Sequence, residues 1–369
     1  MHDCMHHESR VEKRLDELVA FDTRNPGGDE RPLAEKLARE LAGLGASAVE
    51  VLEAAGHFSA FARFGDGSPS LLLNAHIDTV PANTGYTSDP LLLVRRERRL
   101  YGLGAADTKG AIAAILEALS LRKEAGRPPP KLAVLFSGDE ELGGASMHQF
   151  LASERARGLA HAIVCEPTGC RVGIRHRGVY AAQIRARSPG GHSSLADTVA
   201  NPLATLARAA VALDDLGARS RRLGPPGLQG ICMTIAALEG GMAFNIIPAL
   251  ATLTFSVRPP PGVDVQMLVN EARGCVGEAT GSLSTEWQGV ASNPAFATRE
   301  LSAFVPLFGD LARDPVDLPF GTEAGNFVER GIDAVVFGPG RIDQAHKADE
   351  FISLDELVQA VRIFGQVMA

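Results

Sequence analysis

The chain has 369 residues, 45% of them hydrophobic and 22% charged, which suits a globular protein of two domains. A net charge of −8 with both signs scattered argues against a nucleic-acid-binding protein. No apolar stretch is long enough to span a membrane and the N-terminus lacks a signal core, so we expect a cytoplasmic protein without a membrane partner.

Helix and strand patterns alternate in the first third of the chain. Apolar residues have helical spacing over 33–44, before Gly45, and again over 111–121, after Gly110. Short apolar runs typical of buried strands occupy residues 71–73, 132–136 and 163–165. This alternation predicts an α/β domain whose mixed sheet is covered by helices on both faces.

The pattern changes near Gly178 and returns roughly 110 residues later. In between, we predict a strand, a helix with proline in its first turn, a loop-rich stretch and two more strands, at 179–187, 202–216, 219–230, 231–238 and 249–257. We therefore expect a smaller α+β unit at 179–286, inserted into a domain formed by 1–178 and 287–369. Further apolar segments of that domain lie at 304–311, 334–337 and 354–368, the last as a closing helix.

Two histidines and three acidic residues each lie at the mouth of a turn, and four of the five come straight after an apolar run: His76, Asp107, Glu141, Glu166 and His346. Two imidazoles and three carboxylates, one able to bridge, can bind a pair of divalent cations. Sites in α/β sheets gather beyond the carboxyl ends of strands, where independent surface residues would not all fall. Two divalent cations carry one more positive charge than three carboxylates balance, and one bound hydroxide would neutralise this excess.

His76 and Asp78 are two positions apart at a strand end, so their side chains face the same side. Asp78 can then hold one ring nitrogen of His76 and leave the other for metal. Alone, this His-x-Asp pattern is more often a chance pairing.

Glu140 precedes Glu141 in the loop after 132–136. Adjacent glutamates usually mark an exposed surface. Here the side chains of neighbouring residues point in different directions, so one carboxylate can bind metal while the other faces a bound water.

The glycine-rich segment 102–110 precedes a helix, but it matches no nucleotide-binding motif. Asp107 stands where a dinucleotide fingerprint has glycine, and Lys109-Gly110 reverses the order of the phosphate loop. The glycines permit a tight turn that can present Asp107 to metal, although Asp107 could instead cap the helix.

Other residues fit structural roles. The five cysteines lack CxxC spacing, so we expect reduced thiols. From spacing alone, His192 is a turn histidine and Arg258 an exposed strand end. We interpret one group as part of a frayed terminus: His2, His6 and His7. Four other histidines are interpreted as structural or surface residues: His57, His148, His161 and His176. An exposed turn between strands accounts for four arginines: Arg95, Arg96, Arg98 and Arg99.

These segments, in their order and spacing, resemble the dinuclear zinc metallopeptidase and deacylase family that includes acetylornithine deacetylase, succinyl-diaminopimelate desuccinylase and carboxypeptidase G. The resemblance covers nearly the whole chain. The matching segments are 74–81, 102–110, 137–147, 165–168, 190–194, 245–248, 255–258 and 338–350. Thr322-Glu323-Ala324 and the glycines at 338 and 340 with His346 are most similar to the acetylornithine deacetylase branch.

The resemblance implies that Asp107 bridges two divalent ions and is followed by a cis peptide. His76 and Glu166 would complete one site, and Glu141 and His346 the other. The ions would be zinc, although cobalt or manganese also suits these nitrogen and oxygen donors.

The resemblance further implies that Glu140 is the general base. The inserted unit would be a dimerisation lid, giving a homodimer in which His192 reaches the partner's active site and stabilises the oxyanion. Asn245 would assist His192, and Arg258 would bind the substrate α-carboxylate.

We therefore expect a metal-dependent amide hydrolase acting on an N-acyl amino acid, with N-acetylornithine as the first candidate. N-acetylcitrulline differs only at the distal end of its side chain, and succinyl-diaminopimelate and dipeptides come next. Glu323 could bind a cationic substrate side chain, support the site or start a helix. A catalytically silent, metal-binding dimer is the non-enzymatic alternative, which the complete set of ligands and base disfavours.

Overall fold

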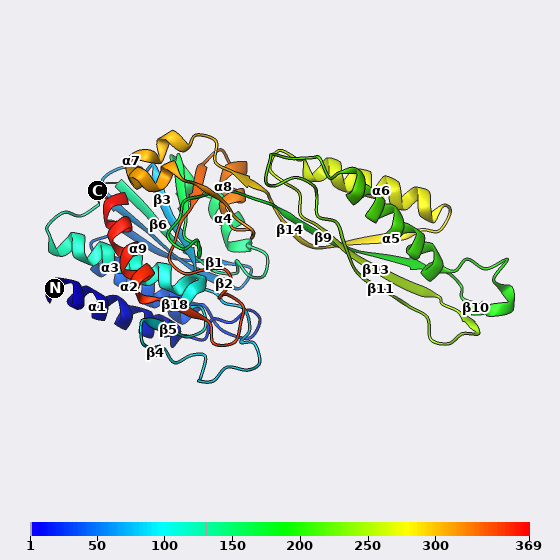
Figure 1. The fold of residues 1–369 in the computed structure, drawn as a ribbon, viewed down its shortest axis with the longest axis horizontal. Helices are drawn as coiled ribbons and strands as arrows, with labels where there is room; N and C mark the ends of the chain where they lie inside the picture. The colour runs from blue at the N-terminus through cyan, green and yellow to red at the C-terminus, as the bar shows by residue number, and fades with distance from the viewer. Residues whose placement is uncertain (1, 130) are drawn as a thin grey trace. The chain divides into compact units, whose positions relative to one another are not determined.

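The computed structural model describes residues 2–129 and 131–369, which form two compact units. Unit 1 comprises Met1–Ile174 and Ala297–Ala369, and unit 2 is the inserted segment Arg175–Phe296. Unit 1 has a mixed sheet with helices on both faces, and unit 2 has a smaller α+β fold (Figure 1). The predicted fold class is confirmed.

Four adjacent parallel strands form the centre of the sheet in unit 1. Their order is β6 (Lys131–Ser137), β3 (Leu71–His76), β7 (His161–Val164) and β17 (Asp333–Val336). Antiparallel strands flank them: β2 (His57–Gly65) and β1 (Ala48–Ala54) beyond β6, and β8 (Gly173–His176) beyond β17. The short strands β15 (Phe296–Ala297) and β16 (Val316–Asp317) both pair with β8. The central strands are buried on both faces, which explains their unbroken apolar runs.

Helices cover both faces of this sheet. On one face α1 (His2–Val19), α3 (Gly110–Glu124) and α9 (Leu354–Val367) pack against one another, and α2 (Arg31–Gly43) packs on β1 and β2 (Figure 1). On the other face, α4 (Ala145–Ala152) places Phe150 with its ring centre 5.5 Å from that of Phe61, and α8 (Ala324–Glu329) contacts β7 and β17. Within the described parts of the chain, no helix has the length and apolar character needed to cross a membrane.

A small three-stranded sheet lies at the edge of unit 1. It consists of β18 (Phe351–Ser353), β5 (Arg99–Tyr101) and β4 (Val94–Arg96). The arginine-rich turn predicted between two strands is the hairpin of β4 and β5. Arg98 in this hairpin donates a 2.8 Å hydrogen bond to Asp355 and is exposed, as a solvated turn requires.

Unit 2 is an antiparallel sheet covered on one face by two helices. The strand order is β11 (Thr234–Gly240), β13 (Leu250–Val257), β9 (Val179–Arg187) and β14 (Thr285–Asn293). The helices α5 (Pro202–Arg219) and α6 (Val265–Thr280) pack against each other on this sheet (Figure 1). Alternate residues of β13 are buried, as expected for a strand with one covered face. A separate two-residue pairing joins β10 (Gly191–His192) to β12 (Ile246–Ile247).

Several sequence-based boundaries were wrong. The first residues, interpreted as a frayed terminus, belong to the helix α1, which begins at His2. The limit expected at residue 286 falls within β14, whose pairing with β9 keeps it in unit 2. Neither α6 nor β14 was predicted, and the strand expected from residue 231 begins at Thr234. The apolar segment at 304–311 forms the short α-helix α7 (Val305–Phe308), which ends where Gly309 takes a φ of 55°, and a 3-10 helix follows at Gly309–Arg313.

Candidate metal centre

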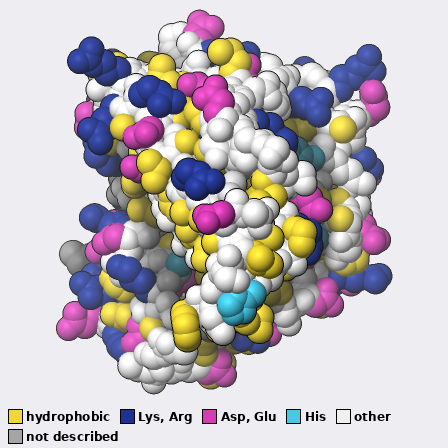
Figure 2. All heavy atoms as spheres, turned by 90° about the vertical axis from the view of Figure 1, so that its right-hand side faces the viewer, with side chains coloured by type: hydrophobic (Ala, Val, Ile, Leu, Met, Phe, Trp, Pro, Cys, Tyr) yellow, Lys and Arg dark blue, Asp and Glu magenta, His cyan; other side chains and the backbone are white. Residues whose placement is uncertain are grey.

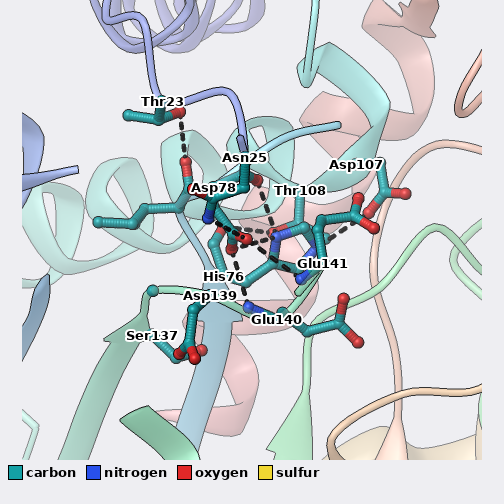
Figure 3. A network of polar contacts seen from close by, with 12 residues as sticks. Thr23, Asn25, His76, Asp78, Asp107, Thr108, Ser137, Asp139, Glu140 and Glu141 are labelled. Carbon is teal, nitrogen blue, oxygen red and sulfur yellow. Dashed lines mark hydrogen bonds and ion pairs between the residues drawn. The ribbon is translucent and has the colours of Figure 1, made fainter. Parts of the chain in front are cut away.

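The carboxyl ends of the four central parallel strands carry candidate ligands. His76 is the last residue of β3, the loop with Glu140 and Glu141 follows β6, and Glu166 and His346 follow β7 and β17. Parallel strands end at the same edge of a sheet, so these residues meet although they are far apart in the sequence. Figure 3 shows several of them converging from different segments of the chain.

Asp107 reaches the same edge from the turn before α3. Gly104 permits this turn, because its φ is 75° and a Cβ there would lie 2.6 Å from Cγ2 of Thr79. The peptide bond after Asp107 is cis, as the family resemblance implied. The two carboxylate oxygens of Asp107 then face different histidines: Oδ1 lies 3.0 Å from Nε2 of His76, and Oδ2 lies 3.4 Å from Nε2 of His346.

Two clusters of possible metal ligands share Asp107. One joins it to His76 and Glu166, and the other joins it to Glu141 and His346. Within each cluster the ligand atoms lie within 4.8 Å of one another. The structure thus brings together all five residues that the sequence singled out, in the two groups that the resemblance implied.

Asp78 connects the His76 strand to the loop that carries Glu140 and Glu141. Its Oδ1 accepts a 3.1 Å hydrogen bond from the backbone N–H of Glu140, and its Oδ2 accepts one of 3.1 Å from that of Glu141 (Figure 3). Asn25 donates a further 2.9 Å hydrogen bond to Oδ2. Asp78 is fully buried, so this single carboxylate fixes the backbone of both glutamates.

Burial and close charges shift the pKa values in this cluster. Burial raises the pKa of Glu140 and of Glu166 well above the ordinary range of a glutamate. Burial opposes the charged form of His76, but hydrogen bonds to Asp107 and Asp78 outweigh it and raise the pKa of that imidazole. Against the effect of burial, hydrogen bonds with His346 and His76 lower the pKa of Asp107.

The side chains present fit a pair of divalent metal ions. Imidazole nitrogens and carboxylate oxygens are suitable donors for zinc and similar metals. Asp107 directs one oxygen into each cluster, as a bridging ligand must. Desolvation raises the pKa of the half-buried Glu140 and of the buried Glu166, and a bound cation would favour the charged forms of both.

Glu323 is buried beside this cluster and does not start a helix with its side chain. It is 2% exposed, and its Oε2 accepts a 2.7 Å hydrogen bond from the hydroxyl of Ser137, at the end of β6. Burial raises the pKa of Glu323 to about 7. Although Glu323 precedes α8, its side chain makes no capping hydrogen bond, so the helix-start alternative is wrong. Its contacts favour support of the strand end that leads to Glu140.

The three other predicted site residues lie in unit 2, and all are exposed. His192 and Asn245 are neighbours, because β10 pairs with β12 and the N–H of Ser193 donates a 3.0 Å hydrogen bond to the backbone oxygen of Asn245. Arg258 follows the last residue of β13, whereas Asn245 precedes the first. At the usual rise of a strand, β13 separates Arg258 from His192 and Asn245 by roughly 25 Å.

Sequence reasoning assigned no role to several buried polar residues around the centre. Asn25 donates to Asp78 and, at 2.6 Å, to Glu30, which in turn lies 2.9 Å from Nδ1 of His57. Glu350 accepts hydrogen bonds from the turn that carries Asp107. Glu350 follows His346 closely and precedes a strand. The local sequence does not distinguish a buried acidic residue in such a loop from an exposed one.

Comparisons with known proteins agree with this geometry. The model of peptidase family M20/M25/M40 matches residues 72–369. The chain belongs to this family. It is therefore a metal-dependent hydrolase that acts on amide bonds, as predicted.

Among members of the M20/M25/M40 family with a known activity, N-acetyl-L-citrulline deacetylase of Xanthomonas campestris is 34% identical over 96% of both chains. Acetylornithine deacetylase of Myxococcus xanthus is 30% identical over 96% of both chains. Identity at this level over almost the full length extends the family assignment to both units.

Solved structures share the fold at lower identity. The M20 family metallo-carboxypeptidase Sso-CP2 of Sulfolobus solfataricus superposes with a TM-score of 0.81 at 18% identity, covering 96% of this chain and 97% of its own. A Bacillus subtilis protein described as a dinuclear metal-binding peptidase of the M20 family gives a TM-score of 0.71 at 15% identity, covering 99% and 98%.

Proposed function

We propose that this protein removes the acetyl group from an N-acetylated amino acid of the ornithine or citrulline type, using two divalent ions held around Asp107. The observation that carries the proposal is the placement of Asp107, whose two oxygens face His76 and His346. The two deacetylases described above support the choice of substrate class.

Zinc is the metal we propose, with His76, Asp107 and Glu166 around one ion and Asp107, Glu141 and His346 around the other. Cobalt and manganese suit the same donors. When bound, such ions polarise the acyl carbonyl and lower the pKa of the attacking water. Elemental analysis of freshly purified active protein identifies the resident metal.

Glu140 is the general base in this proposal. Its side chain is half-buried, and one of its carboxylate oxygens lies within 4.8 Å of a ring nitrogen of His76 and of a carboxylate oxygen of Glu141, beside the ligands that we propose. It accepts the proton of the attacking water at its carboxylate and donates this proton to the leaving amine nitrogen. Asp78 holds the backbone of Glu140 in place for both steps.

The partner that we propose is a second copy of the chain, bound through unit 2. Figure 2 shows hydrophobic side chains, in yellow, on the face that it draws. Phe244 is 99% and Met242 92% exposed, and both lie next to the pairing of β10 with β12 that carries His192. A dimer would cover these apolar side chains.

His192 and Arg258 fit such a dimer better than a monomer. Because β13 separates them, we propose that they serve different active sites. Arg258 would bind the α-carboxylate of the substrate with its two parallel N–H groups, and its side chain makes no hydrogen bond within the described chain. His192, assisted by Asn245, would donate a hydrogen bond to the oxyanion in the partner's site.

N-acetylornithine and N-acetylcitrulline differ at the distal end of the side chain. Glu323 was the sequence's candidate partner for a cationic side chain, but its burial and its bond to Ser137 favour a supporting role. We therefore do not assign Glu323 to the selection of the amine of ornithine over the uncharged group of citrulline.

The test is steady-state turnover on N-acetylornithine, N-acetylcitrulline, N-succinyl-diaminopimelate and a dipeptide, before and after chelation. We expect the highest kcat/KM on an acetylated substrate and loss of that activity when the metal is removed. Negligible rates on both acetylated compounds would refute the substrate class, and rates that survive complete metal removal would refute the metal centre.

A further inference from the structure

Glu350 has a contact pattern that is not explained by a role as a surface residue or as a member of an ion pair. Its side chain is 2% exposed. Oε1 accepts hydrogen bonds from the backbone N–H groups of Ala106, at 2.8 Å, and Asp107, at 3.1 Å. Oε2 accepts one of 2.9 Å from the N–H of Gly104. The carboxylate therefore holds the turn that presents Asp107.

This turn depends on Glu350 because regular secondary structure does not satisfy it. The N–H groups of Gly104, Ala106 and Asp107 precede the first full turn of α3, where no helical carbonyl is available. A carboxylate accepts hydrogen bonds through both oxygens and strengthens each of them by its charge. Like charges on Glu350 and Asp107 repel each other, so the backbone hydrogen bonds that Glu350 accepts must offset that repulsion.

The backbone of Glu350 is fixed by a different set of contacts. Its carbonyl oxygen accepts a 3.0 Å hydrogen bond from the N–H of Gly102, which continues the pairing of β18 with β5. The preceding residue, Asp349, accepts hydrogen bonds of 2.8 Å from both the N–H and the hydroxyl of Thr87. The Glu350 side chain therefore projects from an anchored strand onto the turn before α3.

Glu350 also follows His346 by four residues. His346 has a φ of 58° and depends on the loop around it for its orientation. One short segment thus carries His346 at one end and the carboxylate that holds Asp107 at the other. His346 and Asp107 both belong to the cluster that also contains Glu141.

We propose that Glu350 is a positioning residue that fixes Asp107 relative to His346 and so creates the cluster of Asp107, Glu141 and His346 as a metal site. This inference rests on the proposed metal centre. Glu350 does not touch the substrate or the ions, and it acts through the backbone of the turn. The cluster of His76, Asp107 and Glu166 depends on it less, because β3 and β7 place two of its three ligands directly.

The chain contains a matched control for this role. Asp333, at the first residue of β17, is 8% exposed and also accepts three backbone hydrogen bonds, from Arg299 and Glu300 at 2.8 Å and from Ala334 at 3.0 Å. It lies at the end of β17 opposite to the one that leads to His346. Substitution there disturbs a comparable set of hydrogen bonds without touching the metal centre.

The experiment compares the parent protein, Glu350→Gln and Asp333→Asn. Each metal-free protein is titrated with Co²⁺, followed by calorimetry and by the visible absorption of the bound ion. The parent should bind two equivalents. In Glu350→Gln an amide N–H₂ faces a backbone N–H, so we expect one equivalent to bind nearly as in the parent and the other at least about tenfold more weakly, with a changed spectrum. Asp333→Asn should lose thermal stability but keep both equivalents.

Two parent-like equivalents in Glu350→Gln, with an unchanged cobalt spectrum, would overturn the proposal. If that variant does not fold, Glu350→Asp serves instead, because it keeps the charge and shortens the reach, and the same loss of one equivalent is expected. Failure of the parent protein to bind two equivalents would count against the metal centre itself, which separates the two hypotheses.

Discussion

Nδ1 of His76 lies 2.9 Å from the backbone oxygen of Asp78, closer than the 3.3 Å to the Asp78 carboxylate. A carbonyl oxygen can only accept, so Nδ1 carries a hydrogen, and Nε2, 3.0 Å from Oδ1 of Asp107, is the ring nitrogen left for a metal ion. The sequence predicted that Asp78 orients His76, but the backbone makes the shorter contact. The carboxylate is then available to hold the loop of Glu140 and Glu141.

Replacing Asp78 by alanine should therefore disturb this loop more than the tautomer of His76. We expect metal affinity and kcat/KM each to fall about 10–100-fold, since the amides of Glu140 and Glu141 lose their acceptor. Competition with a chromogenic chelator measures the affinity. Asp78→Asn, which keeps one acceptor oxygen, should lie between the alanine variant and the parent, and equal effects of both variants would contradict this account.

Glu140 and Glu141 offer a matched pair of substitutions. Glu140→Gln should keep both metal ions while kcat falls roughly 10²–10⁴-fold, because the base is lost. Glu141→Gln should lose metal from the cluster with His346, whose Nε2 lies 2.8 Å from Oε1 of Glu141. Bound metal per chain, measured by mass spectrometry beside kcat, distinguishes the two. Full activity of metal-loaded Glu140→Gln would exclude Glu140 as the base.

Glu323 should make the stability of the metal-free protein depend on pH. Burial raises its pKa from 4.5 to about 7, so between these values the folded state binds more protons than the unfolded state. The stability that Glu323 contributes to the folded state is thus present at low pH, where its carboxyl is protonated, and is lost as the pH rises towards 7. Glu323→Gln should be more stable than the parent by roughly 1–3 kcal/mol at pH 8 and equal to it near pH 4.

Urea unfolding of both chelated proteins across this pH range tests the Glu323 prediction. Glu329→Gln, an exposed substitution at the last residue of the helix α8 that follows Glu323, is the matched control. A constant difference between Glu323→Gln and the parent at every pH would show that Glu323 has no raised pKa in the folded protein.

His192 is expected to act across the dimer, and mixed dimers test this directly. His192→Ala should keep its metal ions and lose about 10²–10³ in kcat. Mixed with the equally inactive Glu140→Gln, it should recover about a quarter of the parent's sites, since a mixed dimer has one site with both residues intact. No recovery after subunit exchange would place His192 and Glu140 of one chain in the same site.

Phe244 tests the proposed interface. Its side chain is almost fully exposed, and Phe244→Asp would bring a charge into a dimer contact. We expect a monomer by light scattering, with both metal ions bound and little turnover, because unit 1 alone supplies the ligands. Arg222→Asp, another exposed position of unit 2, should leave the dimer intact. A monomer that retains full turnover would contradict cross-subunit catalysis.

The sequence singled out residues that meet in the structure where apolar runs mark the strands that carry them. His76 ends β3, and Glu141, Glu166 and His346 follow β6, β7 and β17. Asp107 was recognisable from the glycines around it. Glu350 and Asn25 were not assigned, because their roles depend on which backbone N–H or side chain lies opposite them, and local sequence does not determine that. The same limit applies to β14, which is a strand only through its pairing with β9.

The order of the ligands along the chain has a consequence for synthesis. His76, Asp107, Glu141 and Glu166 all emerge before unit 2, and His346 emerges only after unit 2 is complete. A growing polypeptide on the ribosome therefore holds the residues of one cation site long before the other can close. Occupancy by both cations would thus mark chains whose translation is nearly finished.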